Sequence, residues 1–128
     1  MRSFLFVPAD SERKLAKGPS SGPDGLILDL EDSVAADRKP IARDMALAYL
    51  QSANRAGPKL YVRVNALDTG LTLGDLAVVM RGKPDGIVFP KCVGQANLDL
   101  LANYLDALEA REGIEPGVII IDHFGMIS

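Results

Sequence analysis

The fold is decided by the stretch Gly25-Leu26-Ile27-Leu28-Asp29-Leu30-Glu31-Asp32-Ser33-Val34, in which an apolar run passes directly into three carboxylates within four positions. The apolar part does not alternate with polar residues, which is typical of a parallel strand buried on both faces. Like charges this close repel and raise one another's pKa, so they indicate a cation, a basic partner or a proton-transfer role at the strand end. The alternative is that the acids begin a helix, whose N-terminus favours negative charge.

Similar apolar runs recur on both sides of this stretch, separated by longer segments of helical period. We expect strands at Ser3 to Val7, Gly25 to Leu30, Lys59 to Asn65, Gly86 to Pro90 and Gly117 to Ile121. The clearest helices are expected at Asp37 to Ala56, ended by Gly57-Pro58, and at Gln95 to Glu112. This alternation predicts an α/β fold with a parallel sheet, made of four βα units and a fifth strand.

Two architectures fit a strand, loop and helix that repeat about every 25–35 residues: a (β/α)8 TIM barrel and an open doubly wound sheet. A complete barrel needs about 250 residues, so a chain of 128 residues would form a partial barrel. An open sheet would be complete at this length, but the turn Pro8-Ala9-Asp10-Ser11 lacks the G-x-G-x-x-G spacing of a phosphate loop. Either way, we expect residues 1–128 to form a single domain.

Composition narrows the class of protein. The chain is 48% hydrophobic and 24% charged with a net charge of -3, which is typical of a globular protein and disfavours nucleic acid as a partner. Cys92 is the single cysteine, which excludes an intrachain disulfide and a multi-cysteine zinc site. Because apolar runs are far shorter than a signal-peptide core or a membrane span, we expect a cytoplasmic protein with no membrane partner.

Every expected strand is followed by, or ends in, residues that can do chemistry. In chain order they are Asp10 and Ser11; Asp29, Glu31 and Asp32; Arg63 and Asn65; Lys91; and Asp122 and His123. Catalytic residues of barrel enzymes come from the carboxyl ends of several strands, so we expect these side chains to face one pocket.

Four segments carry a resemblance to a known family: Arg2-Ser3-Phe4-Leu5-Phe6-Val7-Pro8, Leu28-Asp29-Leu30-Glu31-Asp32-Ser33-Val34, Tyr61-Val62-Arg63-Val64-Asn65 and Gly86-Ile87-Val88-Phe89-Pro90-Lys91. In order and spacing they resemble the citrate lyase beta-subunit-like family, which includes malyl-CoA and citramalyl-CoA lyases. The resemblance runs from residue 2 to about residue 112. It implies the N-terminal half of a TIM barrel that binds magnesium and makes or cleaves a carbon–carbon bond between an acyl-CoA and a 2-oxo acid.

The resemblance also implies roles for the residues at the strand ends. Arg63 matches the family's substrate arginine, and a guanidinium suits bidentate binding of a carboxylate. The alternative for Arg63 is an ion pair with Glu31 or Asp32, and the two roles can coexist. Glu31 and Asp32 match the family's acidic pair, which lies beside the metal and its waters. Lys91 either binds substrate or pairs with Glu31.

Departures from the family concern the metal. The family's fifth strand runs into a Glu-Thr-x-x-Gly-like segment whose glutamate binds magnesium, and here Asp122 falls near that position and is the expected ligand. The family's second ligand, an aspartate on the sixth strand, has no counterpart in these 128 residues. His123 is a weaker candidate for a base or ligand, since it is the single histidine. Cys92 has no base near it in sequence, so we expect a small buried residue and not a nucleophile.

Coenzyme A phosphates require cationic donors, and Arg13 and Lys14, with Lys17, lie on a short helical stretch from Ser11 to Gly18. A solvated basic helix face is the alternative for these residues.

The sequence therefore predicts a magnesium-dependent lyase that cleaves or forms a 3-hydroxyacyl-CoA of the malyl-, citramalyl- or citryl-CoA type. The alternative is a truncated, catalytically incomplete half-barrel that acts as a binding or assembly module. An open-sheet binding domain is a third interpretation. Since a half-barrel exposes sheet edges, we also expect a homo-oligomer.

Overall fold

The computed structural model describes residues 3–18, 22–90, 94–114 and 118–122, with residues 94 and 118–122 described by their backbone alone. The elements follow in the order β1 (Phe4–Pro8), α1 (Glu12–Lys17), β2 (Gly25–Asp29), α2 (Lys39–Ser52), β3 (Lys59–Arg63), α3 (Thr72–Val79), β4 (Gly86–Pro90), α4 (Gly94–Glu112) and β5 (Val118–Asp122). Short 3-10 turns, η2 (Ala36–Arg38), η3 (Leu67–Thr69) and η4 (Met80–Gly82), join some of them. The predicted α/β alternation of four βα units and a fifth strand is confirmed.

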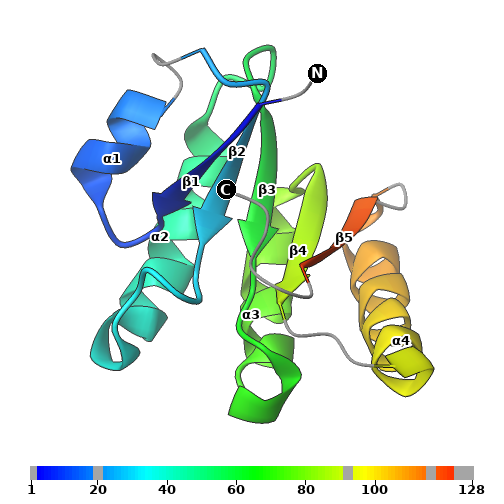
Figure 1. Cartoon of the computed structure of the whole chain (residues 1–128). Helices are drawn as coiled ribbons and strands as arrows, with labels where there is room; N and C mark the ends of the chain where they lie inside the picture. The colour runs from blue at the N-terminus through cyan, green and yellow to red at the C-terminus, as the bar shows by residue number, and fades with distance from the viewer. Residues whose placement is uncertain (1–2, 19–21, 91–93, 115–117, 123–128) are drawn as a thin grey trace.

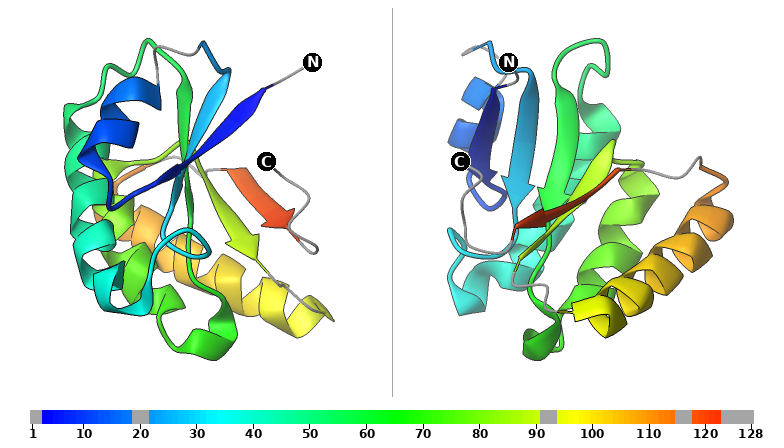
Figure 2. Two further views of the ribbon diagram at one scale, coloured as in Figure 1. Left: turned by 60° about the vertical axis from the view of Figure 1, so that its left-hand side comes forward. Right: turned by 45° about the vertical axis from the view of Figure 1, so that its right-hand side comes forward.

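The five strands form one parallel sheet in the order β1-β2-β3-β4-β5 (Figure 1). Figure 2 shows the helices gathered on one side of this sheet. A doubly wound sheet reverses its strand order at a switch point, whereas a barrel adds each strand beside the previous one. The sequential order therefore excludes the open doubly wound sheet and identifies the fold as part of a TIM barrel.

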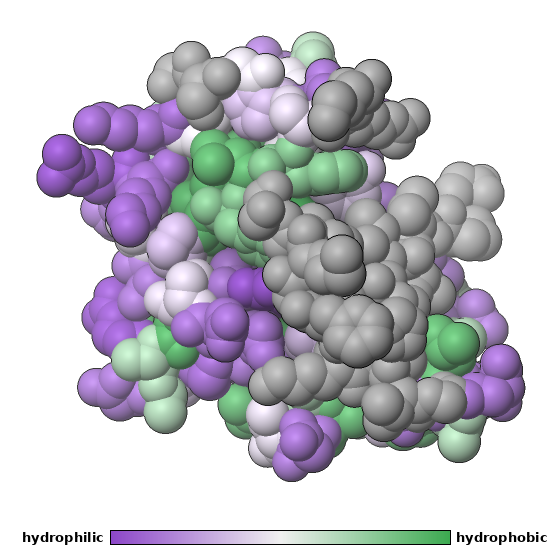
Figure 3. Space-filling view, in the orientation of Figure 1, coloured by the Kyte–Doolittle hydropathy of each residue, from purple (hydrophilic) through white to green (hydrophobic). Residues whose placement is uncertain are grey.

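Both faces of the sheet are apolar, which explains the absence of alternation in the strands. On the helix side, side chains such as Leu28 and Val62 pack into the main core. On the opposite side, Ile27, Tyr61 and Val88 form a second buried cluster with Phe4 and Phe6. Figure 3 shows this opposite side, with an apolar area over the strands and hydrophilic residues beside it.

Local side-chain chemistry moves the ends of several predicted elements. The helix expected at Asp37 to Ala56 is instead the 3-10 turn Ala36–Arg38 followed by Lys39–Ser52. It ends early because Ala53 is extended and the Asn54 side chain accepts a hydrogen bond from the Ala56 N–H, closing a turn. Within the described residues, no helix has the length and apolar character of a membrane span.

Strand β2 ends one residue before its predicted limit at Leu30, and β3 ends two residues before its predicted limit at Asn65. Pairing continues to the Leu30 N–H, which donates to the Arg63 carbonyl oxygen at 2.9 Å. The chain then turns, because the Asp29 carboxylate accepts from the backbone N–H groups of Glu31 and Ser33.

Gly82 allows η4 to approach α2 closely. A Cβ at Gly82 would lie 2.5 Å from the Leu50 Cβ and 2.8 Å from the Leu50 Cδ1, whereas at Gly57 the nearest atom is the Asn54 carbonyl oxygen at 3.4 Å. We expect Gly82→Ala to lower the free energy of unfolding by about 1–3 kcal/mol through overpacking, and Gly57→Ala to change it by less than about 1 kcal/mol. Urea unfolding measures both, and equal midpoints for the two variants would contradict this packing.

Candidate functional site

A buried ion pair joins the carboxyl ends of β2 and β3. Parallel pairing sets Asp29 opposite Arg63, and both side chains lie on the face that carries Ile27 and Tyr61. The Arg63 Nε donates to Asp29 Oδ1 at 2.9 Å and Nη2 donates to Oδ2 at 2.8 Å. Asp29 is 0% exposed and Arg63 is 8% exposed, so a bidentate, charge-assisted contact satisfies two charges removed from water.

The same carboxylate also shapes the loop that follows β2. Asp29 Oδ1 accepts from the Glu31 N–H at 2.9 Å, and Oδ2 accepts from the Ser33 N–H at 3.0 Å and the Ser33 hydroxyl at 2.7 Å. These contacts turn the chain directly after the strand. They hold the backbone of the acidic loop against the ion pair.

Hydrogen bonding outweighs burial in setting the charge state of this pair. Burial by itself raises the pKa of Asp29, but the hydrogen bonds from Arg63, Ser33 and the two backbone N–H groups together lower that pKa below its ordinary 3.8. Burial by itself lowers the pKa of Arg63, while its contact with Asp29 and the charges of Glu31 and Asp32 raise that pKa overall. Both groups are therefore ionised at neutral pH.

Arg63 also contacts a second acid and an aromatic ring. Glu31 Oε1 lies 3.5 Å from the Arg63 Nε, and the Glu31 side chain is 11% exposed. The Phe6 ring lies under the guanidinium, with 4.3 Å between Cζ and the ring centroid. Asp32 is exposed and acts on Arg63 through its charge. β1, β2 and β3 thus surround one guanidinium at the carboxyl end of the sheet.

The structure brings together three of the predicted site residues: Glu31, Asp32 and Arg63. The ion pair predicted for Arg63 exists, but its bidentate partner is Asp29, with Glu31 as a longer contact. The acids do not begin an α-helix, because α2 starts only at Lys39. The pairing of Asp29 with Arg63 has a signal in the sequence. When the two strands are aligned as parallel neighbours with Gly25 opposite Lys59, Asp29 lies opposite Arg63.

Arg13 and Lys14 lie on α1 with exposed side chains. Lys14 and Lys17, with Leu5, Pro8 and neighbouring residues of β1, line an open cavity of about 480 Å³. Asp10 pairs with Arg38 across 3.1 Å.

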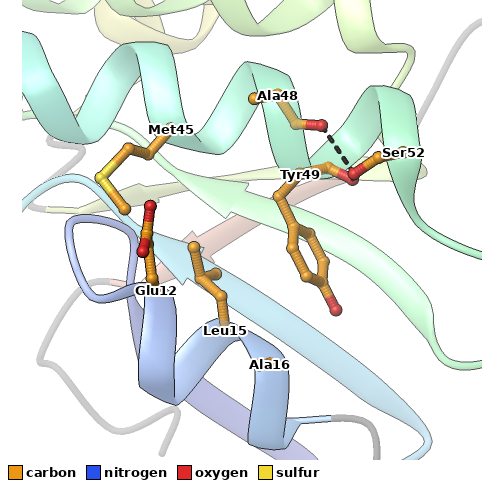
Figure 4. A pocket seen from close by; sticks show the side chains of 7 residues that line it. All are labelled: Glu12, Leu15, Ala16, Met45, Ala48, Tyr49 and Ser52. Carbon is orange, nitrogen blue, oxygen red and sulfur yellow. Dashed lines mark hydrogen bonds between the residues drawn. The ribbon is translucent and has the colours of Figure 1, made fainter.

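A second cavity, of about 330 Å³, lies between α1 and α2 (Figure 4). Leu15, Met45 and Tyr49 make it mainly apolar, Glu12 is its one charged lining residue, and burial raises the pKa of Tyr49. It belongs to the helical layer and contains none of the residues that surround Arg63.

Other predicted residues lie outside what the structure describes. Lys91, Cys92 and His123 fall outside the described residues. Asp122 is the last residue of β5, beside Pro90 of β4, and only its backbone is described. Among the described residues no group of three or more His, Cys, Asp or Glu is arranged to hold a metal ion.

Comparison with known proteins matches residues 2–121 to the model of the family described as HpcH/HpaI aldolase/citrate lyase. The chain belongs to this family.

Comparison with two relatives and one solved structure shows how much of a family member's length this chain covers. (3S)-malyl-CoA thioesterase of Cereibacter sphaeroides is 38% identical over 101 residues, which cover 79% of this chain and 35% of the thioesterase. Citrate lyase subunit beta of Escherichia coli is 38% identical over 117 residues, covering 91% of this chain and 38% of the subunit. Protein CitE of Mycobacterium tuberculosis, solved in complex with magnesium and pyruvate, superposes with a TM-score of 0.64 at 29% identity, covering 94% of this chain and 43% of CitE. This family member therefore spans less than half the length of these relatives.

Loss of the Asp29 charge leaves the Arg63 guanidinium buried without its bidentate counter-ion. We expect Asp29→Asn to lower the free energy of unfolding of this family member by about 3–5 kcal/mol. Asp10→Asn, which breaks a pair whose side chains are 19% and 43% exposed, should cost no more than about 1 kcal/mol. Urea unfolding compares the two, and a similar cost for both would contradict a buried ion pair at the strand ends.

Stability should also depend on pH through Asp29. Because folding lowers the pKa of Asp29 below 3.8, the ionised carboxylate stabilises the fold fully above that value, and this stabilisation is lost as pH falls through the folded-state pKa. Ser33→Ala removes a hydroxyl donor to Asp29, so its acid unfolding should begin at higher pH than that of the wild type. Urea midpoints between pH 2 and pH 6 measure this, and parallel curves would contradict it.

Proposed function

We propose that this chain supplies the N-terminal part of the active site of a magnesium-dependent carbon–carbon lyase. The reaction would cleave or form a 3-hydroxyacyl-CoA of the malyl-, citramalyl- or citryl-CoA type, with an acyl-CoA and a 2-oxo acid as the other partners. Family membership supports the class of reaction, and a relative complexed with magnesium and pyruvate, a 2-oxo acid, supports the metal and the substrate class.

One observation carries the proposal: a buried guanidinium held in a fixed plane at the carboxyl end of the sheet, with acids beside it. Asp29 fixes the plane of Arg63 through two hydrogen bonds. A preoriented guanidinium is what recognition of a planar carboxylate requires, and lysine cannot replace it. In this role Arg63 would bind and orient the carboxylate of the 2-oxo acid product or of the matching substrate group.

The acids and the outer basic residues would complete the binding of substrate. Glu31, which is 11% exposed beside Arg63, and Asp32 would orient water and ligands around the reacting group. Lys91 would bind substrate at the same edge, and Arg13 and Lys14 would bind the phosphates of coenzyme A. In this scheme the chain is the N-terminal half of a larger barrel, as a single domain of residues 1–128.

Magnesium, when bound, would act as a Lewis acid on the oxo group. Asp122 is the ligand that we propose for it in this chain, on the basis of its position at the end of β5. The described acids do not form a three-ligand group.

A catalytically incomplete half-barrel that binds ligand or assembles with another chain is the second function that we propose. The chain spans 35% of the thioesterase and 38% of the lyase subunit, and its described part contains no three-ligand group. The two functions differ in whether the purified chain turns over substrate.

An assay with malyl-, citramalyl- and citryl-CoA, with and without magnesium, separates the two functions. We expect cleavage that requires magnesium and that falls about 100-fold or more in Arg63→Lys, because an ammonium keeps the charge beside Asp29 but loses the planar fork. Glu31→Gln should also lower kcat. Arg55→Lys is the matched control, since Arg55 binds the carbonyl oxygens of Gly82 and Lys83 away from the site.

Cooperative unfolding in urea shows that the purified chain is folded. If such a folded chain cleaves none of the three substrates, the result would contradict the enzyme proposal and favour the binding or assembly module. Equal activity of Arg63→Lys and wild type would contradict the role of Arg63 while leaving the lyase proposal in place.

A further inference from the structure

Lys39 connects the loop after β2 to the residue that follows β3. Its Nζ donates to the carbonyl oxygens of Leu30 at 3.0 Å and Glu31 at 2.9 Å, and to Asn65 Oδ1 at 2.7 Å. An ammonium has three N–H donors, and here each has one acceptor. The Glu31 backbone is therefore held on both sides, by Asp29 at its N–H and by Lys39 at its carbonyl oxygen.

The Asn65 acceptor is itself fixed from behind by α3. Its backbone N–H and its Nδ2 donate to Asp75 Oδ2 at 2.9 and 2.8 Å, and its carbonyl oxygen accepts from the Thr72 hydroxyl at 2.7 Å. Asp75 Oδ1 accepts from Arg43 Nε at 3.0 Å and Nη2 at 2.9 Å. Since Asn65 and Asp75 are each 1% exposed, this network gives Lys39 an immobile point of attachment.

Helix stability does not account for a lysine at this position. Lys39 is the first residue of α2, Arg38 is its N-cap, and the first turn contains no acid. A helix N-terminus favours negative charge, so two cations there are unfavourable for the helix itself. Both cations instead reach the strand ends, Arg38 to Asp10 after β1 and Lys39 to the loop after β2.

We propose that Lys39 is a positioning residue for Glu31: by tying the Leu30 and Glu31 carbonyl oxygens to Asn65, it sets where the Glu31 carboxylate lies relative to Arg63. The proposal rests on the function proposed for Glu31 and Arg63. It adds a residue that touches no substrate and acts through the backbone of the acidic loop. The Glu31 Oε1 to Arg63 Nε separation of 3.5 Å is the geometry that Lys39 maintains.

Lys39→Met tests this, because methionine keeps most of the apolar stem and removes the ammonium. Arg55→Met is the matched control: Arg55 also binds backbone carbonyl oxygens, those of Gly82 and Lys83, but at the opposite end of the strands. In NMR spectra of the 15N-labelled chain, we expect Lys39→Met to shift the Glu31 N–H and Arg63 Nε–H signals. We expect it to accelerate hydrogen exchange of the Glu31 N–H about tenfold, equivalent to a loss of about 1.4 kcal/mol of local stability. Arg55→Met should leave both signals and this rate unchanged.

The outcomes separate positioning from a general contribution to stability. The proposal would be overturned if Lys39→Met lowered the urea midpoint but left the Glu31 N–H and Arg63 Nε–H signals at their wild-type positions. If Lys39→Met does not fold, Lys39→Gln replaces it, since an amide keeps two N–H donors but no charge. In the lyase assay, Lys39→Met should lower kcat at least tenfold with a much smaller change in KM. A wild-type chain without lyase activity would overturn the proposed function, whereas the NMR comparison decides the role of Lys39 in either case.

Discussion

The buried contact between Asp29 and Arg63 is the interaction on which the carboxyl end of this sheet depends. Two opposite charges removed from water are tolerated only when geometry and hydrogen bonding satisfy both, and here five donors converge on one carboxylate. The contact joins the end of β2 to the end of β3, and the same carboxylate turns the chain after β2 by accepting from the Glu31 and Ser33 N–H groups. It also places Glu31 beside the guanidinium, so one carboxylate links the register of the sheet to the geometry of the candidate site.

The helical layer supports this arrangement from the other side of the sheet. Arg38 of η2 and Lys39 of α2 reach the strand ends, and Asp75 of α3 fixes Asn65 after β3. The polar network is buried beside a large apolar core, where each unpaired group would be costly. The hydrogen bonds of this network therefore fix the positions of the polar groups at the strand ends.

Much of this arrangement could be predicted from the sequence, and the failures have local causes. Unbroken apolar runs predicted five parallel strands, of which β2 and β4 are buried throughout whereas β1 is only partly buried. Polar residues at the strand ends predicted the meeting of Arg63, Glu31 and Asp32. The sequence placed Asp29 among the acids at the strand end but did not identify it as the partner of Arg63. That pairing depends on the register between two strands, which the sequence does not state. Lys39 was missed because it is the first residue of an ordinary helix, and no spacing in the sequence relates it to Asn65, 26 positions away.

The sequence by itself determined the class of fold and the kind of chemistry. Burial preferences are encoded residue by residue, and the acidic and basic residues at strand ends are visible in the chain as written. Periodicity left the sequential and the reversed strand order open, and the resemblance implied the sequential order of a barrel, which the tertiary structure confirmed. Only the tertiary structure assigned Asp29 to Arg63 and Lys39 to the Glu31 loop. Strand order and charge pairing depend on distances between residues far apart in the chain, which packing fixes and local pattern does not contain.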